Sequence, residues 1–268
     1  MLEQTSRFVW NRSDSWFGGF SGAEMDVDGR TLTLITDRGS LVVARLIRHG
    51  DRLIAVRLGR RTALKASDGL ALPDIEGDAE DIAIGADGQA FISFERHHRV
   101  DRLTLSDGRL NQYVPAPDAG RLGLNSGLES LAIDSHGRLF TIPEKPPQGE
   151  SSLPLSVLEN GAWRRYRSVP RRGPFLPVSA DFDDRDRLYL LERAFGPLGF
   201  RSRIRRFDLT SPGATETILL TTPPGRFDNL EAITAWRDTA GDVRLTLVSD
   251  DNFFPIQRTQ VVEFRVTE

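Results

Sequence analysis

The sequence contains no cysteine, and Lys65 and Lys145 are its only lysines. Without cysteine, thiol catalysis, thiolate metal sites and disulfide bonds are excluded. No apolar run approaches the roughly 20 residues of a membrane-spanning helix, and no apolar helical period of useful length appears. The formal net charge of −3 gives no electrostatic reason to expect a nucleic-acid partner. Met1–Val9 lacks the apolar segment of a signal peptide.

Five short segments repeat one pattern along the chain. In each of them one or two small or polar residues precede an acidic residue, and apolar residues follow. The segments are Gly22–Val27, Asp78–Ile84, Gly127–Ile133, Ser179–Asp183 and Asn229–Thr234. Their acidic positions, Glu24, Glu80, Glu129, Asp181 and Glu231, are 56, 49, 52 and 50 residues apart. A period near 50 residues is typical of the blades of a β-propeller.

A turn rich in Asp and Gly follows each segment and leads into a second strand. The predicted second strands are Thr31–Thr36, Gln89–Phe94, Arg138–Ile142, Arg187–Leu191 and Arg244–Ser249. Further strands complete the units, but the last unit has only three, ending with Gln260–Val266. The strand-like segment Ser6–Trp10 can supply the missing strand and close the ring, which hides the sheet edges. We therefore predict an all-β fold in which residues 1–268 form a single propeller of five four-stranded blades. Six blades is the alternative if residues 113–123 hide a degenerate blade.

Acidic residues are expected to gather at one mouth of the channel. The first strand of each blade lines the channel, so the five repeated acids should form a ring. The second strands also end in acids, and antiparallel pairing brings their ends to the same mouth. These acids are Asp37, Glu95, Glu144, Glu192 and Asp250 with Asp251. Two like charges ~4 Å apart repel by roughly 4 kcal/mol at an effective dielectric near 20. A bound cation would remove this cost, and a wide ring of oxygens suits Ca²⁺ better than Mg²⁺.

Basic residues follow four of the second-strand acids. They are Arg38, Arg96, Lys145 and Arg193, whereas Asn252 follows Asp251 in the fifth unit. Such groups at the rim could clamp a phosphate or a carboxylate. The opposing interpretation is structural, because repeated acids can also cap backbone N–H groups between blades or pair with these same arginines.

Other features of the predicted mouth have two interpretations each. His97 and His98 could include a general acid, although a solvated loop pair is the simpler interpretation. Three long loops are expected above the mouth at 145–153, 193–202 and 251–257. The last two carry phenylalanines, which either form a ligand wall or pack onto the propeller.

The repeated segments resemble a known family. Phe17–Glu24, Asp78–Ile82, Asn125–Leu131 and Asp228–Ile233, with the Glu-Arg pairs at 95–96 and 192–193, are similar to the phytase-like family described as "esterase-like activity of phytase". This family occurs mainly in exported bacterial proteins, which implies a periplasmic or secreted location; without that resemblance a cytoplasmic one would stand. It also implies phosphoesterase activity carried by the repeated acids.

The leading hypothesis is a metal-dependent hydrolase of phosphoric esters. Ca²⁺ would be held by the five ring acids, Glu24, Glu80, Glu129, Asp181 and Glu231. The substrate, a small phosphate ester or another anion, would be held by Arg38, Arg96, Lys145, Arg193 and Asn252. Glu95 or Glu192 would orient the attacking water. We expect a monomer. Two alternatives stay open, namely a ligand-binding propeller without turnover and a lactonase-type propeller.

Overall fold

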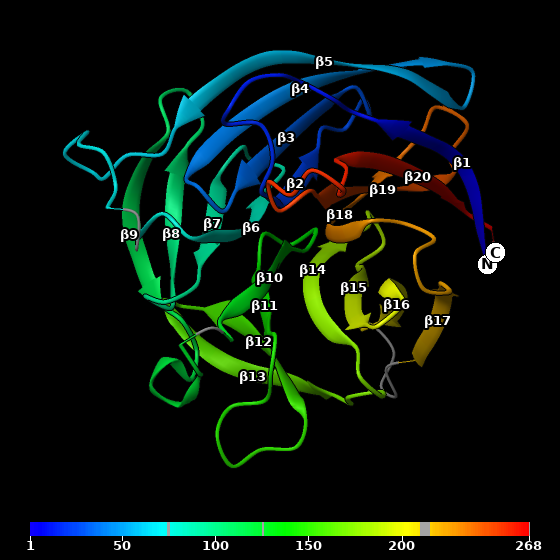
Figure 1. Ribbon diagram of the computed structural model, residues 1–268. Coiled ribbons are helices and arrows are strands. Elements are labelled where there is room, and N and C mark those ends of the chain that lie inside the picture. The colour runs from blue at the N-terminus through cyan, green and yellow to red at the C-terminus, as the bar shows by residue number, and fades with distance from the viewer. Residues whose placement is uncertain (74–75, 125, 210–214, 268) are drawn as a thin grey trace.

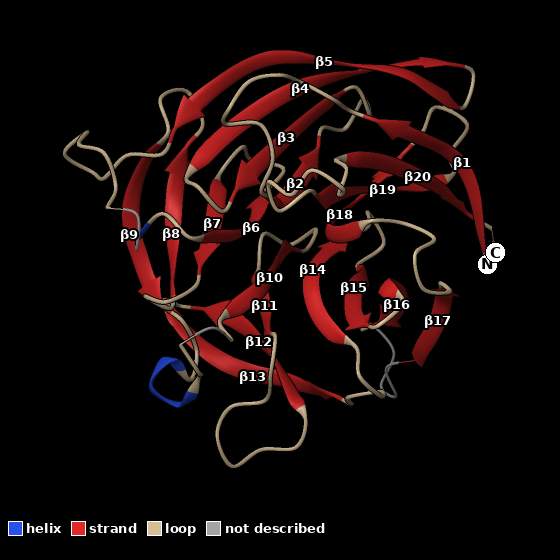
Figure 2. Cartoon of the chain, in the orientation of Figure 1, coloured by secondary structure: helices blue, strands red, loops and turns tan. Residues whose placement is uncertain are grey.

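The computed structural model is a ring of five antiparallel sheets around a central channel (Figure 1). It describes residues 1–73, 76–124, 126–209 and 215–267, so Asn125 of the third repeated segment lies outside the described residues. Apart from short 3-10 turns such as Ala119–Arg121, the described chain is strand, turn and loop (Figure 2). The described residues contain no helix that is long and apolar enough to cross a membrane.

Each sheet is one blade, and its strands follow one another in chain order from the channel outward in the first four blades. Blade 1 contains β2 (Phe20–Met25), β3 (Thr31–Thr36), β4 (Ser40–His49) and β5 (Arg52–Ala63). Blade 2 contains β6 (Ala79–Ile84), β7 (Ala90–Phe94), β8 (Arg99–Thr104) and β9 (Arg109–Pro115). Blade 3 contains β10 (Leu128–Ile133), β11 (Leu139–Pro143), β12 (Leu153–Glu159) and β13 (Ala162–Val169). Blade 4 contains β14 (Leu176–Phe182), β15 (Arg187–Gly196), β16 (Gly199–Asp208) and β17 (Thr215–Thr221).

Blade 5 joins the two ends of the chain and closes the ring. It contains β18 (Asn229–Arg237), β19 (Val243–Asp250), β20 (Gln260–Val266) and, outermost, β1 (Leu2–Val9). Strand β1 runs antiparallel to β20, from the pair of Leu2 with Val266 to the pair of Val9 with Gln260. The termini therefore lie side by side (Figure 1). The predicted closure and the count of five blades are confirmed. The six-bladed alternative is wrong, because the described part of 113–123 is the end of β9 followed by a short 3-10 turn and a loop.

The Asp-rich turns hold the first two strands of the blades together at the far end from the mouth. In blade 3, the Asp134 Oδ1 accepts the backbone N–H of Arg138 at 2.8 Å and that of His136 at 3.0 Å. Asp183 accepts the N–H of Arg187 at 3.0 Å in the same way. The short Asp side chain can accept backbone N–H groups of its own turn, and this preference is why the turns could be recognised from the sequence.

A β-bulge occurs at the same place in every first strand. The ladder between first and second strands skips one residue at Ser21, Glu80, Glu129, Val178 and Glu231. Because a bulge leaves one residue unpaired and turns it out of the regular alternation, these five residues are structural equivalents. These five positions define a bulge frame, in which the other residues of a blade have their equivalents in the other blades.

The apolar core lies between neighbouring blades rather than in the channel. Between blades 5 and 1, Trp10 stacks on Phe20 with ring centroids 5.6 Å apart, and Phe17 meets Phe20 edge-on at 5.3 Å. Burial of this kind holds adjacent sheets face to face and leaves the channel for polar side chains.

One predicted loop is a hairpin. The segment 193–202 does not form a long loop, because β15 continues to Gly196 and β16 begins at Gly199. The backbone ladder is unbroken up to the pair of Phe195 with Phe200. The pairs beyond Arg193 involve only β15 and β16, because β14 pairs with β15 no further than Arg193. The end of this hairpin therefore projects from the four-stranded sheet. The loops at 145–152 and 251–257 are confirmed as irregular segments and turns.

Candidate functional site

A cavity of about 290 Å³ opens at the mouth of the channel, where first strands begin and second strands end. Among the described residues its charged lining consists of eight carboxylates and one guanidinium. These residues are Asp37, Asp78, Glu80, Glu95, Glu129, Glu144, Glu231, Asp250 and Arg193. Gly19, Phe20, Ser21 and Asn252 complete the wall. The predicted gathering of acids at one mouth is therefore present in the structure.

The inner ring of the cavity carries three acids rather than five. Glu80, Glu129 and Glu231 occupy the bulge of their strands and line the cavity. The equivalent positions in blades 1 and 4 are Ser21 and Val178. Blade 4 therefore contributes no carboxylate to the inner ring.

Glu24 and Asp181 lie three residues further along their strands, away from the mouth. Glu24 accepts the backbone N–H of Ile84 in blade 2 at 3.2 Å. Asp181 accepts the N–H of Ala235 in blade 5 at 2.7 Å. Thr234 donates to Asp181 at 3.1 Å and stands 3.5 Å from Glu24. These two acids bond to the neighbouring blade, as the structural interpretation anticipated, and the structure does not bring them to the cavity with the other three.

The outer ring comes from the ends of the second strands. Asp37, Glu95, Glu144 and Asp250 occupy equivalent places there, each just beyond or at the last pair of its ladder. In blade 4 the equivalent residue is Arg193 rather than Glu192, since Glu192 pairs with Pro177 one step deeper in the sheet. The outer ring is thus four acids and one arginine.

Glu192 is not in the cavity. It is fully buried within blade 4, where the Arg203 Nε donates to it at 2.6 Å and the Arg205 Nη1 at 2.9 Å. Adjacent residues of a strand point to opposite sides, so a shift of one position exchanges the glutamate for the arginine. The prediction that Glu192 orients water loses its geometric basis.

Arg193 reaches across to blade 5. Its guanidinium contacts the Glu231 carboxylate and donates to the Asn229 side-chain oxygen at 3.0 Å. The Asn229 amide in turn donates to Glu231 at 2.7 Å. Glu231 is therefore the one inner-ring acid, among those described, with a cationic partner in the cavity.

The crowded carboxylates hold protons more tightly than isolated ones. Burial, and then the charges of Glu95 and Asp78, raise the pKa of Glu80 well above its usual value. Burial raises the pKa of Asp37 to about 6 against the opposing effect of Arg38, and it raises the pKa of Asp250 to about 7. Burial also raises the pKa of Glu129 well above its usual value, and Glu80 adds to the effect. A cation in the cavity would oppose all of these shifts.

One group of acids has the spacing of a cation site. Asp78, Glu80 and Glu95 each offer an oxygen, and these oxygens lie within 4.8 Å of one another. Ca²⁺ binds oxygen ligands at about 2.3–2.6 Å, so two ligands of one ion lie at most about 5 Å apart. The cavity lining offers carboxylate and amide oxygens and no imidazole, which suits a hard cation. The donor set therefore fits Ca²⁺.

The residues predicted to hold the substrate separate into two groups. Arg193 and Asn252 line the cavity. Arg38 instead stacks 3.2 Å from the ring centroid of Phe253, Arg96 pairs with Asp78 at 2.9 Å, and Lys145 pairs with Glu144 at 2.7 Å. Those three do not line the cavity, and the clamp role predicted for them stays a prediction.

Sequence reasoning left two acids out of the site. Asp78 lines the cavity from the residue before β6, and its signal was the acid two positions before Glu80. Asp81 is buried below the cavity and accepts the N–H of Leu131 and the hydroxyl of Ser179, both at 3.0 Å. It thereby ties blade 2 to blades 3 and 4. Gly22 leaves room for it, since a Cβ there would lie 2.9 Å from an Asp81 oxygen.

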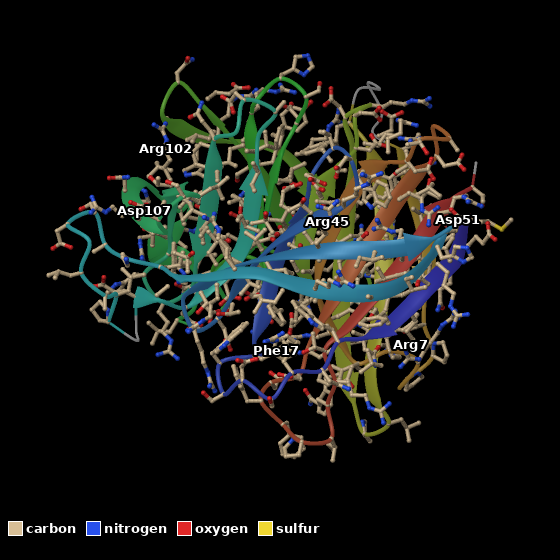
Figure 3. The ribbon with its side chains drawn as sticks, turned by 90° about the horizontal axis from the view of Figure 1, so that it is seen from above. Arg7, Phe17, Arg45, Asp51, Arg102 and Asp107 are labelled. Carbon is tan, nitrogen blue, oxygen red and sulfur yellow. The ribbon has the colours of Figure 1, made fainter. Side chains whose placement is uncertain are left out.

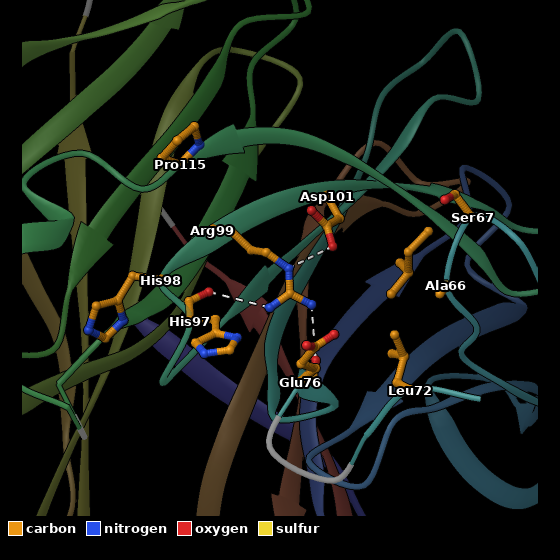
Figure 4. Close-up of a pocket in the computed structure, with 10 residues that line it drawn as sticks. Ala66, Ser67, Leu72, Glu76, His97, His98, Arg99, Asp101 and Pro115 are labelled. Carbon is orange, nitrogen blue, oxygen red and sulfur yellow. Dashed lines mark hydrogen bonds and ion pairs between the residues drawn. The ribbon is translucent and has the colours of Figure 1, made fainter. Parts of the chain in front are cut away.

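A second cavity of about 450 Å³ lies beside the mouth on blade 2 (Figure 4). Arg99 crosses it, bonded to Asp101 at 2.8 Å and to the Glu76 carbonyl at 3.0 Å. His97 and His98 border this cavity and not the acidic one. His98 contacts the Gly123 carbonyl at 3.0 Å, and burial lowers its pKa. The described geometry therefore gives neither histidine a place in the acidic cavity.

A comparison with protein families gives one match. The model of the phytase-like family, described as "esterase-like activity of phytase", matches residues 15–253. The chain belongs to this family. A search of curated proteins finds no match.

Solved structures share the propeller fold with this phytase-like chain. One is the PQQ-bound aldose sugar dehydrogenase of Streptomyces coelicolor, with 12% identity, a TM-score of 0.50, and coverage of 97% of this chain and 98% of that chain. Another is a protein described as a candidate gluconolactonase, with 13% identity, a TM-score of 0.51, and coverage of 93% and 76%. At such identities the likeness concerns the fold, and the site must be argued from its own residues.

Proposed function

We propose that this phytase-like propeller hydrolyses phosphoric esters in the acidic cavity, with Ca²⁺ as its cation. The observation that carries the proposal is the lining of eight carboxylates around one guanidinium. Such a lining repels an anionic ester until cations neutralise it, and it then presents positive charge at the surface of the cavity. The family description, an esterase-like activity, supports the same class of reaction.

The residues proposed to hold the cation are Asp78, Glu80 and Glu95. Glu129 lies close enough to Glu80 for the two charges to repel, and its carboxylate adds to the negative charge around the proposed cation. Bound there, the cation would polarise a phosphoryl oxygen and stabilise the charge that develops during hydrolysis. Glu95 is also fixed by the N–H of Gly127 at 3.3 Å, which keeps its carboxylate directed to the cavity.

Arg193 is proposed to orient the ester. It already points into the cavity, and Glu231 with Asn229 holds it there. A guanidinium can bind two oxygens of one phosphoryl group through parallel hydrogen bonds. A carboxylic ester offers only its single carbonyl oxygen as a strong acceptor. This geometry favours phosphoric esters over carboxylic esters and lactones.

Asp37 is proposed to accept the proton of the attacking water. It lines the cavity in blade 1, beside the cation ligands of blade 2, and burial raises its pKa to about 6, so the carboxylate is basic enough to accept a proton near neutral pH. Gly19 permits this position, because a Cβ there would lie 2.1 Å from Asp37 Oδ1. A proton acceptor must be held near the reacting water and still have a free oxygen.

The test is a panel of chromogenic esters after removal of metal with EDTA. Bis(4-nitrophenyl) phosphate, 4-nitrophenyl phosphate, 4-nitrophenyl acetate and a six-membered lactone are each assayed with and without added Ca²⁺. Hydrolysis of a phosphoric ester that returns with Ca²⁺ supports the proposal. Ca²⁺-dependent turnover of the lactone alone would select the lactonase alternative, and Ca²⁺ binding without turnover of any ester would select a ligand-binding propeller.

A further inference from the structure

Large apolar side chains are exposed at the tips of two loops on the mouth side of blades 4 and 5. Phe195 and Leu198, at the tip of the β15–β16 hairpin, are 74% and 79% exposed. Phe254 and Ile256, between β19 and β20, are 53% and 79% exposed. In the side view of Figure 3 the yellow hairpin and the orange-red loop both reach the edge on the side where Phe17 is labelled. Soluble proteins seldom leave such side chains grouped without a use.

These loops form one continuous surface. The segment 222–228 lies between them, because the N–H of Gly225 donates to the Phe200 carbonyl at 2.9 Å and the N–H of Arg258 donates to Asp228 at 3.0 Å. We call this surface the blade 4–5 rim. It is defined by Phe195, Leu198, Arg226, Phe254, Ile256 and Arg258.

Arginines without acidic partners accompany the apolar tips. Arg226 and Arg258 are exposed, and neither lies within ion-pair distance of a carboxylate of the described chain. The Arg226 guanidinium donates to the Gln4 side chain at 3.0 Å and stacks over Phe227. Other surface arginines include paired ones, such as Arg165 and Arg237, and ones without an ion pair in the described chain, such as Arg57. The rim is distinguished by the combination of apolar tips with two such arginines, beside the Asp228 carboxylate.

We propose that the blade 4–5 rim docks the propeller on a phospholipid bilayer that carries anionic headgroups. Apolar tips can enter the boundary between headgroups and acyl chains, while the arginines meet lipid phosphates. This orientation sets the mouth of the acidic cavity against the lipid surface, so docking on anionic headgroups requires a cation in the cavity to neutralise its carboxylates, and Ca²⁺ is present in the binding assay. The docking surface itself belongs to the loops, so it does not depend on ester cleavage.

Two observations favour a large surface over a small ligand or a protein groove. None of the four apolar side chains lines either cavity at the mouth, so they do not wall a small-molecule site. They also stand at separate loop tips rather than around one pocket, which suits shallow insertion more than the packed centre of a protein interface.

Vesicle co-sedimentation tests the proposal with the full chain. The probes are vesicles of phosphatidylcholine and vesicles of an equal mixture of phosphatidylcholine and phosphatidylglycerol. The wild type should bind the anionic vesicles more tightly. The double variant L198S with I256S should lower that partition coefficient by about tenfold or more. R226Q with R258Q should reduce binding to the anionic vesicles on the order of tenfold and leave the weak binding to phosphatidylcholine unchanged.

The matched control is V27S with I54S, which removes exposed apolar side chains that are 95% and 51% exposed outside the rim. This control should bind like the wild type. Equal losses in the control and rim variants would overturn the proposal, as would failure of the wild type to bind either vesicle. Circular dichroism of each variant excludes unfolding as a cause. Vesicle binding by a protein that cleaves no ester supports the docking surface and counts only against the proposed activity.

Discussion

Arg193 and Glu231 lie in adjacent blades, and their side chains meet inside the acidic cavity. The pair exists because blade 4 places an arginine where the other blades end their second strands in an acid. It breaks the fivefold symmetry of the cavity at one side. The same side carries the projecting β15–β16 hairpin, so the asymmetry of charge and that of shape coincide.

Replacing Arg193 with glutamine should impair turnover of phosphoric esters more than it impairs cation binding. The guanidinium would be lost as a phosphoryl contact, and Glu231 would lose its partner. An unsatisfied buried polar group costs about 1–3 kcal/mol and a charged one more, so the unfolding free energy should fall by about 3 kcal/mol. Steady-state kinetics and urea unfolding measure the two effects. R171Q, on an exposed loop residue, is the control and should change neither.

The stability of the cation-free protein should fall as pH rises towards neutrality. The folded pKa values of Asp37 and Asp250 are raised to about 6 and about 7, from 3.8. Between about pH 4 and pH 7 the folded protein therefore holds protons that the unfolded chain has released. This stabilising contribution is fully present below about pH 4 and is lost as pH passes through 6 and 7.

Urea unfolding across this pH range checks the effect, with D37N/D250N as the comparison. At about 1.4 kcal/mol per pKa unit the two shifts set an upper bound of about 6 kcal/mol, and solvent screening of these cavity-lining carboxylates lowers it, so the wild type should lose about 2–4 kcal/mol relative to the double variant between about pH 4 and pH 7.5. Added Ca²⁺ should reduce that loss, because a bound cation favours the ionised carboxylates. If the two proteins change in parallel with pH, these two groups do not carry the effect.

The bulge frame predicts different outcomes for Glu80 and Glu24. E80Q removes a proposed cation ligand, so the increase in melting temperature on adding Ca²⁺ should shrink or vanish. For the wild type, cation at about 100 times its Kd adds about 2.7 kcal/mol. E24Q should keep the full response, because Glu24 bonds Ile84 outside the cavity. Thermal unfolding with EDTA and with Ca²⁺ compares the two. A lost response in E24Q alone would contradict the frame.

The architecture was predictable because its signals are local. Turns that contain Asp recur once per blade, and the count of strands left one vacancy that the N-terminal segment could fill. The residue-level frame was not predictable. Gly22-Ala-Glu24 is similar in sequence to Asp78-Ala-Glu80. The bulges nevertheless show that Ser21, and not Glu24, is the structural equivalent of Glu80.

A one-residue ambiguity affected blade 4. The Glu-Arg pair at 192–193 looks like the pair at 95–96, but it stands one residue earlier relative to the bulge, because the residue that pairs two positions before the bulge is Glu95 in blade 2 and Arg193 in blade 4. Side chains alternate along a strand, so Arg193 faces the cavity and Glu192 faces the interior of blade 4. Only pairing with β14 reveals the register, and composition does not encode it.

Glu192 should prove structural rather than catalytic. Its carboxylate is fully buried and accepts bonds from Arg203 and Arg205, so E192Q would leave buried cations without their charge partner. Removing one member of such a pair costs about 3–5 kcal/mol, and the bond from Arg205 to Glu216 at 2.9 Å favours the lower end. Urea unfolding should therefore show a loss of about 3 kcal/mol. Ester turnover measured well below the melting temperature should stay near the wild-type value, and the response to Ca²⁺ should persist. A stable E192Q protein without turnover would instead indicate a catalytic role for Glu192. That role would require β14 and β15 to pair in a different register in solution, so that Glu192 faces the cavity.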